Sequence, residues 1–398
     1  LRLADETGDL DDIDNLSGDY KVIFSTDRFG IRPLFTVSLN DELYFASVLS
    51  ALPFKDNLEA DFQRFPPGNY GLFEKKNGIL GKLEYLEYSD LYSSLKNVYP
   101  KITQEYFEEC KSKVSQSFIE AVYSRMHADR PIACMLSGGL DSSLVAALMA
   151  KYLRDNYPNV KFLTFSVGLK GATDEINALY VSDFIGSEHH HFEVTEKELL
   201  DNILEVVKII GSYDPTSVRA STPQYTLVKK ISEKFPEYKI MGSGDGSDEV
   251  TNGYIYNHKC PNPTEGHNDS VRLLKNIHDY DGLRADRCVS HFGIELRLAF
   301  LDHNFVSTYL NINPILRMPN NLQNVNNIIN GNENLKCGKK IEKWLLRESF
   351  KDMNLLPDEI LWRPKEALSD AISSTQKSWY EIIEDHIKNI PLSSTVYT

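Results

Sequence analysis

A short apolar run followed by a glycine- and serine-rich turn constrains the fold of this chain more than any other feature. Residues 132–136 read Ile-Ala-Cys-Met-Leu, residues 137–143 read Ser-Gly-Gly-Leu-Asp-Ser-Ser, and a second apolar run covers 144–150. Five apolar residues suit either a strand buried on both faces of a parallel sheet or a core helix. The adjacent glycines favour the strand, because they adopt dihedral angles closed to other residues and let a ligand approach the backbone. The segment therefore predicts a strand, a tight turn and a helix.

The beginning of the predicted helix is expected to hold an anion. Ser142 and Ser143 stand where that helix should begin, so its unpaired N–H groups and the positive end of its dipole would face a ligand over the turn. The turn lacks the Gly-Lys-Ser/Thr ending of a Walker phosphate loop, which argues against the common kinase and motor ATPase interpretation. The formal net charge of −14 argues against a broad nucleic-acid surface. An anionic ligand must therefore be met locally.

The rest of the sequence separates into a β-rich part and an α/β part. A length of 398 residues suggests two or three domains. Residues 19–90 contain short β-rich runs separated by turn residues, which predicts an antiparallel sheet with hairpins. From about residue 103 the apolar spacing becomes helical. We expect one domain at 1–95, which begins with an exposed acidic loop at 1–18, and a second domain at 103–398.

The second domain alternates strands and helices. After the first strand and helix, we expect strands at 160–167, 191–194 and 239–241, and helices from about 174, at 199–210 and at 222–235. Right-handed crossovers between such strands give a doubly wound, mostly parallel sheet with flanking helices. The asparagine-rich residues 320–334 are interpreted as an exposed insertion. The predicted fold class is therefore α/β, preceded by a β-rich domain.

A second glycine-rich turn follows the strand at 239–241. Residues 242–249 read Gly-Ser-Gly-Asp-Gly-Ser-Asp-Glu, which brings open backbone and three acids together where a strand ends. Ligands of open α/β sheets bind beyond the carboxyl ends of the strands, so this turn and the turn at 137–143 would face one crevice. Mg²⁺ prefers one or two carboxylates together with phosphate oxygens and water. A ligand that carries phosphate and Mg²⁺ is the expectation.

The run His189-His190-His191 is not expected to hold a metal ion. Side chains along a strand alternate between its two faces, so three consecutive histidines do not converge on one point.

The cysteines and the absence of long apolar runs suggest where the protein is found. Five cysteines are scattered without CxxC pairs, and no signal-peptide pattern opens the chain. No stretch approaches the ~20 apolar residues that a membrane span needs. We expect reduced thiols and a soluble, cytoplasmic protein without a membrane or nucleic-acid partner.

The motif Ser-Gly-Gly-x-Asp-Ser at 137–142 resembles the pyrophosphate loop of the N-type ATP pyrophosphatases, an adenine nucleotide α-hydrolase-like fold whose members split ATP into AMP and pyrophosphate. A series of further motifs then resembles the asparagine synthetase family, and especially its eukaryotic form. These motifs lie in the family's order at 137–143, 166–168, 213–214, 219–221, 244–249, 286–287, 295–302 and 363–366.

The first domain resembles the distal part of the family's N-terminal glutaminase domain, at 27–35, 45–47 and 65–70. That domain is an N-terminal-nucleophile (Ntn) hydrolase, a type 2 glutamine amidotransferase, and it uses a cysteine at the mature N-terminus. Residue 1 here is Leu, and the glutamine-pocket segments are not found. We expect that the sequence omits a stretch of the native protein; the alternative is a protein that uses free ammonia.

The resemblance implies a role for each motif. The implied ATP- and pyrophosphate-binding residues are Met135, Ser137, Gly138, Gly139, Asp141, Ser142, Ser143, Val167, Ser243 and Gly244, with Met135 and Val167 beside the adenine. Asp141 and Asp248 would hold Mg²⁺, and the candidates for aspartate binding are Thr216, Arg219 and Ser221. The implied catalytic residues are Lys365, Asp245 and Arg219: Lys365 would stabilise phosphate charge, and Asp245, where the family usually has Glu, would act on the intermediate and the incoming ammonia.

The resemblance predicts a ligase that makes asparagine from aspartate, ATP and either glutamine-derived or free ammonia. The β-carboxylate of aspartate would attack the α-phosphorus of ATP, pyrophosphate would leave, and ammonia would displace AMP from β-aspartyl-AMP. A homodimer is also implied. Two alternatives stay open: a related AMP-forming ligase with another acceptor, as in β-lactam synthetase, and a nucleotide-binding remnant without catalysis.

Overall fold

The computed structural model of the protein describes residues 20–39, 42–52, 61–76, 79–80, 84–331, 338–365 and 377–388. The predicted acidic loop at 1–18 lies outside the described residues. The chain divides into a first unit, residues 1–95 with 275–283, and a second unit, residues 96–274 with 284–398. The sequence did not predict that 275–283 belongs with the β-rich residues. The guanidinium group of Arg64 makes this contact, since it pairs with Asp279 and donates to the carbonyl of His278.

The first unit is built from two antiparallel sheets, which confirms the β-rich prediction. One sheet contains β1 (Tyr20–Ser25), β5 (Asn69–Lys76), β6 (Ile79–Leu80) and β7 (Glu84–Glu87), and the other contains β2 (Phe35–Leu39), β3 (Glu42–Ala46) and β4 (Asp61–Arg64). Aromatic rings fill the space between them: the ring of Phe24 lies 4.3 Å from that of Phe45 and 5.1 Å from that of Phe65. The apolar side chains of both sheets therefore form one small core.

A five-stranded sheet lies at the centre of the second unit. Its strand order is β10-β9-β8-β11-β12, with β8 (Ile132–Met135), β9 (Leu163–Leu169), β10 (Glu188–Val194), β11 (Ile240–Ser243) and β12 (Glu295–Leu298). Every pairing in it is parallel, which confirms the predicted parallel sheet. The burial of β8 explains why it reads as an unbroken apolar run, whereas β9 is buried over its whole length although it contains Thr164 and Ser166.

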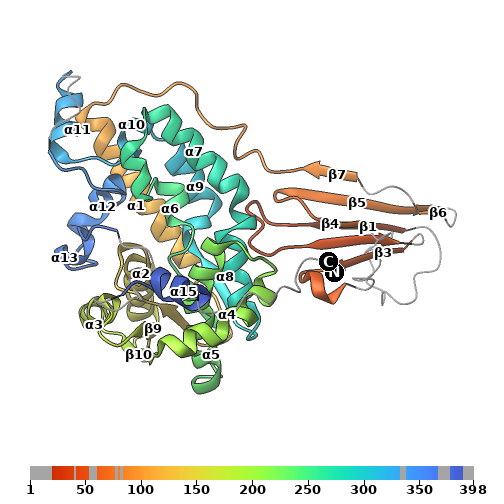
Figure 1. The fold of residues 1–398 in the computed structure, drawn as a ribbon. Coiled ribbons are helices and arrows are strands. Elements are labelled where there is room, and N and C mark those ends of the chain that lie inside the picture. Colours follow the sequence, from red (N-terminus) through yellow and green to blue (C-terminus); the bar gives the residue numbers. More distant parts are fainter. Residues whose placement is uncertain are drawn as a thin grey trace. The chain divides into compact units, whose positions relative to one another are not determined.

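The helices cover the sheet in the doubly wound manner. The chain runs outward from β8 to β9 and β10 through α2 (Leu140–Asn156) and α3 (Thr173–Ile185), then returns to β11 through α4 (Glu196–Ile210) and α5 (Pro215–Lys234). Right-handed crossovers place the outgoing and returning helices on opposite faces, and Figure 1 labels them on opposite sides of β9 and β10. The order of strands therefore reverses between β8 and β11, and crevices at such points bind ligands.

One local prediction is confirmed and one needs correction. The helix after the first turn begins at Leu140 with Gly139 as its N-cap, so Ser142 and Ser143 lie in its first turn, where the helix begins. The charged segment at 295–302 contains the edge strand β12, which the sequence did not predict as a strand. Alternate residues of β12 are exposed and buried, so an edge strand with Glu295 and Arg297 outward has no apolar run to reveal it.

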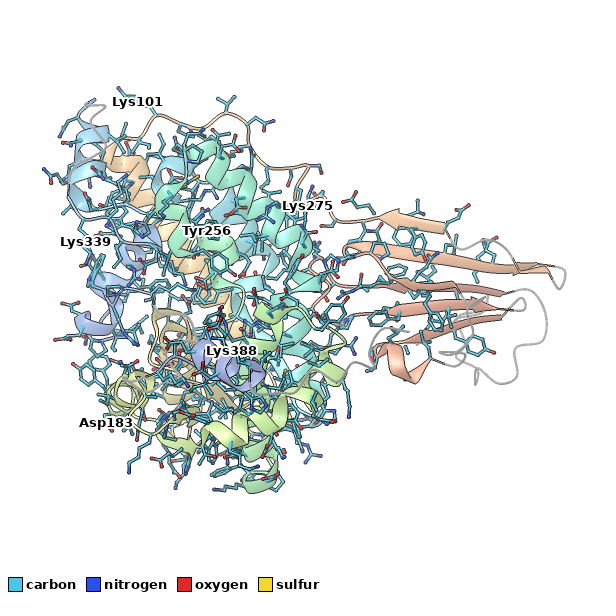
Figure 2. All side chains as sticks on the ribbon, in the orientation of Figure 1. Lys101, Asp183, Tyr256, Lys275, Lys339 and Lys388 are labelled. Carbon is cyan, nitrogen blue, oxygen red and sulfur yellow. The ribbon has the colours of Figure 1, made fainter. Side chains whose placement is uncertain are left out.

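The remaining helices are α1 (Gln104–Ser124), α6 (Ser247–Thr251), α7 (Pro263–Asn276), α8 (Asp281–Ser290), α9 (His303–Leu310), α10 (Pro314–Arg317), α11 (Leu322–Ile329), α12 (Trp344–Phe350), α13 (Asp358–Leu361) and α15 (Trp379–Lys388). No helix among the described residues is long and apolar enough to cross a membrane. Charged side chains such as Asp183 on α3 and Lys388 on α15 are exposed on the second unit (Figure 2).

The asparagine-rich segment is not simply an exposed insertion. Its residues 322–329 form α11, where the side chain of Asn321 caps the helix by accepting from the Asn324 N–H at 2.9 Å. Asn324 and Val325 are buried. Asparagine has a poor helix propensity, so capping and burial must decide this helix. Residues 332–334 lie outside the described residues.

A cluster of phenylalanine rings joins α1 to the C-terminal helices. The ring of Phe118, which has no exposed surface, lies 4.3 Å from Phe300, 4.9 Å from Phe305 and 6.1 Å from Phe350. These partners follow Phe118 by more than 180 residues, so their burial fixes α1 against distant parts of the second unit.

Replacing Phe118 by Ala should lower the free energy of unfolding by about 3–5 kcal/mol, because it removes buried apolar area and leaves a cavity among three rings. Urea unfolding followed by circular dichroism measures the change. Leu204→Ala is the control, since Leu204 is 74% exposed and its loss should cost less than about 0.5 kcal/mol. Equal costs for the two variants would contradict the assignment of Phe118 to the core.

Candidate active site

Two glycines allow close backbone contacts at the carboxyl edge of the sheet, one between the first turn and α3 and one between the two predicted turns. Gly138 has a φ of +76°, and a Cβ on it would lie 2.5 Å from the backbone of Asn177 and Ala178 in α3. A Cβ on Gly244 would lie 2.7 Å from the amide nitrogen of Ser142. Real side chains do not tolerate such distances, so only glycine permits these contacts. The two glycine-rich turns therefore touch each other at Gly244, whereas the sequence predicted only that both would face one crevice.

Serine hydroxyl groups hold the shape of the turn at 137–143. The Ser142 hydroxyl accepts from the Ser137 N–H at 3.2 Å and lies 3.1 Å from the Ser137 hydroxyl. The N–H of Gly139 donates to that same Ser137 hydroxyl at 3.4 Å. The Ser143 hydroxyl is buried without a hydrogen-bond partner among the described residues. The turn is thus curled at the beginning of α2, where backbone N–H groups and the helix dipole favour an anion.

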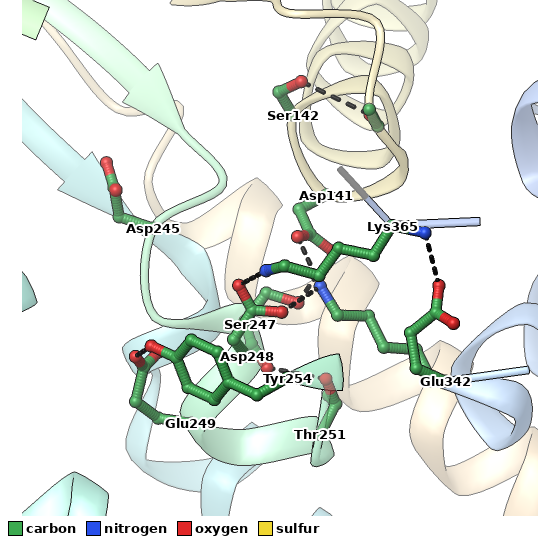
Figure 3. Close-up of polar contacts among 12 residues, drawn as sticks. Asp141, Ser142, Asp245, Ser247, Asp248, Glu249, Thr251, Tyr254, Glu342 and Lys365 are labelled. Carbon is green, nitrogen blue, oxygen red and sulfur yellow. Dashed lines mark hydrogen bonds and ion pairs between the residues drawn. The ribbon is translucent and has the colours of Figure 1, made fainter. Parts of the chain in front are cut away.

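Two carboxylates and two ammonium groups face each other beside this turn (Figure 3). The ammonium group of Lys343 pairs with Asp141 and lies 2.7 Å from Oδ1 of Asp248. The ammonium group of Lys365 pairs with Oδ2 of Asp248. The Ser247 hydroxyl donates to Asp141 at 2.8 Å, so the second turn also fixes the acid of the first. We call Asp141, Asp248, Lys343 and Lys365 the charged cluster.

Asp248 and Lys365 are held in their ionised forms. Burial alone would raise the pKa of Asp248, but the ammonium groups of Lys343 and Lys365 outweigh it and hold that pKa well below its usual value. Burial alone would lower the pKa of Lys365, but the carboxylates of Asp248 and Asp141 outweigh it, so that pKa is raised. Both groups therefore carry full charge at neutral pH.

Lys365 is positioned from both sides. Its backbone N–H donates to Oε1 of Glu342 at 2.8 Å, and the same carboxylate pairs with the buried guanidinium group of Arg347 at 2.6 Å. Its ammonium group lies 5.2 Å from the ring centre of Tyr254. The phenol of Tyr254 in turn donates to Glu249, the acid that ends the second turn. These contacts therefore direct the ammonium group of Lys365 toward Asp248.

Arg363 ties the same C-terminal segment to the first turn. Its guanidinium group donates to the carbonyl of Gly138 at 3.2 Å and lies 3.6 Å from the buried carboxylate of Asp174 in α3. Met135 ends β8 next to this turn, and Val167 lies near the end of β9; both are at least nine-tenths buried. Glu366, the last residue of the sequence motif, lies outside the described residues.

Asp245 has partners of its own. Its carboxylate accepts from the Ser243 hydroxyl at 2.6 Å and from the Gln224 amide at 3.3 Å, and it pairs with the Arg284 guanidinium at 3.0 Å. Figure 3 labels Asp245 apart from Asp141, Asp248 and Lys365. The structure thus brings Ser243 to Asp245, whereas the catalytic role of Asp245 stays a prediction.

The three residues suggested for aspartate binding differ in their surroundings. The hydroxyl of Ser221 is buried and donates to the Ser217 carbonyl at 2.6 Å, so the helix itself uses it. Thr216 is exposed in the first turn of α5. The guanidinium group of Arg219 is half-buried, and its Nε has no hydrogen-bond partner in the described part of the chain. Thr216 and Arg219 therefore remain available to a ligand.

Comparison with known families matches residues 113–266 and 259–397 to the family described as Asparagine synthase. The chain belongs to the asparagine synthase family. It is similar to glutamine-hydrolysing asparagine synthetases from Gallus gallus, at 40% identity over 379 residues, and from Mesocricetus auratus and Homo sapiens, each at 38% over 382 residues. These alignments cover 92–93% of this chain, and the chain spans 64% of the length of each relative.

Among solved structures, the NH3-dependent NAD synthetase of Campylobacter jejuni aligns with 44% of this chain and 76% of that chain, at 18% identity and a TM-score of 0.24. The α/β fold class follows from the parallel sheet and its flanking helices, and the membership in the asparagine synthase family agrees with it.

Lys343 belongs to the site but was not predicted from the sequence. The residue is 1% exposed, has a left-handed φ of +57°, and stands at the N-cap of α12. A Cβ on Gly253 would collide with both Lys343 and Asp248, so this glycine makes room for the pair. Lys343 lies between Glu342 and Trp344 in a segment without a glycine-rich signal. The sequence offers only one hint, which is a lysine directly before a buried helix.

The charged cluster fits a magnesium ion that is held partly by phosphate. The described residues contain no group of three or more His, Cys, Asp or Glu side chains that could hold a metal by themselves. Asp141 and Asp248, however, both pair with the ammonium group of Lys343, so the two carboxylates can reach a common cation. Mg²⁺ commonly uses one or two carboxylates and completes its shell with substrate phosphates and water.

The three histidines of β10 form hydrogen bonds along the strand. His189 lies 2.9 Å from the Thr164 hydroxyl and 2.8 Å from the Ser166 hydroxyl, which also lies 2.8 Å from Nδ1 of His191. His190 instead contacts Glu188 at 3.1 Å. Alternation along the strand thus separates His190 from its neighbours, as expected. Burial, helped by the neighbouring histidines, lowers the pKa of His189 to about 4.

The substitution Gly244→Ala should weaken the binding of pyrophosphate by about ten-fold or more, because the added Cβ would push the two turns apart. Isothermal titration of Gly244→Ala with pyrophosphate and Mg²⁺ measures the change. Gly293→Ala is the matched control: Gly293 has a positive φ, +67°, no atom lies within 4 Å of the position that its Cβ would take, and it precedes β12 at the other edge of the sheet. Unchanged affinity in Gly244→Ala would refute the contact between the turns.

The free energy of unfolding should fall as the pH drops from about 6.5 to about 4. In that window the unfolded chain binds a proton at residue 189 and the folded chain does not, so protonation favours unfolding, by up to about 3 kcal/mol. Urea unfolding at several pH values measures the slope. His189→Gln should reduce it without abolishing it, because burial also lowers the pKa of His267 to about 4. The exposed control His386→Gln should leave the slope unchanged. A slope in His189→Gln equal to that of the wild type would contradict the contribution of His189.

Proposed function

We propose that this chain carries the synthetase reaction of asparagine synthetase. In it, an oxygen of the β-carboxylate of aspartate attacks the α-phosphorus of ATP, and the bond to pyrophosphate breaks with its electron pair on the leaving group. Ammonia then attacks the acyl carbon of β-aspartyl-AMP, AMP leaves, and the nitrogen loses a proton. The observation that carries this proposal is the charged cluster beside the glycine and serine turn in a member of the asparagine synthase family.

The turn at 137–143 and the charged cluster would act as a clamp for pyrophosphate. Ser137, Gly138, Gly139, Ser142 and Ser143 would bind phosphate oxygens through hydroxyl groups, backbone N–H groups and the helix dipole. Lys365 and Lys343 would exchange a carboxylate partner for phosphate as negative charge develops on the leaving group. Charge that is stabilised more strongly in the transition state than in the ground state lowers the barrier.

Asp141 and Asp248 would hold Mg²⁺ together with the phosphates. The ion supplies positive charge to the phosphate oxygens when it is bound. With Asp141 and Asp248 on the ion, the ammonium groups of Lys343 and Lys365 would be free to bind the nucleotide. Met135 and Val167 would lie beside the adenine, and Ser243 and Gly244 would complete the nucleotide site.

Arg219 and Thr216 would bind aspartate. Arg219 forms no ion pair among the described residues, and a half-buried guanidinium group of this kind suits the carboxylate of an amino acid. Ser221 would contribute by supporting the helix, since its hydroxyl donates to Ser217. Asp245 would act on the intermediate and ammonia only if it left Arg284, because the ion pair now occupies its carboxylate.

The proposal also covers the role of the first unit, the source of ammonia, the oligomeric state and the location of the protein. The first unit would be part of a glutaminase domain, and ammonia would come from glutamine or from solution. A homodimer in the cytoplasm would be the working form. Two other outcomes stay open: an AMP-forming ligase with another acceptor, as in β-lactam synthetase, and a nucleotide-binding remnant without catalysis.

Aspartate should stimulate the release of pyrophosphate from ATP in the presence of Mg²⁺ and ammonium, and asparagine and AMP should appear in equal amounts. A coupled pyrophosphate assay and amino-acid analysis measure both. Pyrophosphate release without aspartate dependence would favour another acceptor. Binding of ATP without any formation of AMP would favour the remnant, and in that case Asp141→Asn would change only affinity.

Lys365→Ala should lower kcat by about 10²–10³, because the variant loses a charge that is used in the transition state. Its KM for aspartate should change much less than kcat. Lys197→Ala is the control, since the Lys197 side chain is 83% exposed and pairs with Asp201 at the surface of α4. A kcat for Lys365→Ala within about two-fold of the wild type would exclude this role.

A further inference from the structure

Helix α15 contacts the candidate aspartate-binding arginine at its backbone. Trp379, the first residue of α15, has no exposed surface, and its indole Nε1 donates to the carbonyl of Arg219 at 3.1 Å. Arg219 and Trp379 are separated by 160 residues in the sequence. An indole N–H that is fully buried usually has a defined partner. Here that partner is a backbone carbonyl in the second turn of α5.

Proline inside α5 explains why this carbonyl needs an outside donor. Pro223 lies within the helix, four residues after Arg219. A proline has no N–H, so the helix cannot supply the usual bond from residue 223 to the carbonyl of residue 219. An unpaired buried carbonyl is unfavourable. The indole of Trp379 therefore replaces the hydrogen bond that Pro223 removes, and it does so at the residue whose side chain is the candidate ligand.

The next residue of α15 contacts the side chain of Arg219. The guanidinium carbon lies over the ring of Tyr380, 5.8 Å from its centre. The ring attracts the face of a guanidinium group that lies above it. The N–H donors of the guanidinium group lie at the edges of its plane and point away from the ring. The Nε of Arg219 is buried and has no hydrogen-bond partner among the described residues. Consecutive residues of α15 thus contact both the backbone and the side chain of Arg219.

We propose that Trp379 and Tyr380 are positioning residues that aim the guanidinium group of Arg219 at the carboxylate of the aspartate substrate. This inference rests on the proposed function, because it assumes that Arg219 binds aspartate. Trp379 fixes the helical turn from which Arg219 projects, and Tyr380 fixes the plane of the guanidinium group. Neither residue touches the nucleotide site in this assignment, so their loss should affect aspartate and not ATP.

Kinetics of Trp379→Phe test the backbone contact. The variant keeps an aromatic ring but loses the N–H, so KM for aspartate should rise by about three- to ten-fold, while KM for ATP and kcat stay within about two-fold. Tyr380→Ala should raise KM for aspartate by about three-fold, and Tyr380→Phe, which keeps the ring, should restore it. Equal rises of the two KM values, or no rise for aspartate, would overturn the proposal.

The double variant Trp379→Phe/Pro223→Ala provides a sharper control. Ala at 223 restores the N–H that can bond to the carbonyl of Arg219, so the double variant should regain most of the affinity for aspartate. The free energies of unfolding of the two single variants and the double variant give a second readout without activity. They should be non-additive, with the Pro223→Ala change relieving the cost of Trp379→Phe. Additive free energies would refute the hydrogen-bond replacement.

The two readouts separate this inference from the proposed function. Wild-type protein without aspartate-dependent pyrophosphate release would overturn both the function and the role in aspartate binding, and the unfolding cycle would still report on the contact. Wild-type protein with normal aspartate dependence but an unchanged KM in Trp379→Phe would overturn only the positioning role.

Discussion

The site depends on the ion pairs that the buried ammonium group of Lys343 forms with two carboxylates. This ammonium group joins Asp141 from the beginning of α2 to Asp248 from α6, and it does so from the N-cap of α12, 202 residues after Asp141. A buried charge is stable only when it is paired, and the loss of one partner leaves the others uncompensated. The geometry of both turns therefore depends on the C-terminal helices. This explains why a site that begins with a local motif needs the remainder of the second unit.

The sequence predicted those parts of the site whose chemistry is local. The turn at 137–143, its place at the same edge of the sheet as the turn at 242–249 and the parallel sheet follow from glycines and apolar runs, and the structure agrees with them. Lys343 was missed because its partners lie far away in the chain, and β12 was missed because charged residues interrupt its apolar ones. The helix at 322–329 was missed because capping by Asn321 and burial of Val325 outweigh a poor helix propensity.

Three acids of one turn show why residue type alone could not assign roles. Asp245 pairs with Arg284, Asp248 pairs with two lysines, and Glu249 accepts from Tyr254. They are separated by four positions in sequence, yet each belongs to a different set of partners. The partners come from α8, the C-terminal segment and the residues after α6, so only the folded chain distinguishes a structural ion pair from a candidate metal ligand.

The formal charges of the charged cluster sum to zero, because two carboxylates face two ammonium groups. A polyanion that approaches this site from solution therefore meets no excess of positive charge there, and the chain as a whole carries a formal charge of −14. Long-range attraction steers many anionic ligands to their proteins, and salt slows such encounters. Under the proposed function, the lysines would become available only after contact, when phosphate and its cation replaced their carboxylate partners. The rate of encounter would then be set by collision and by exchange of partners, and salt would have little attraction to screen.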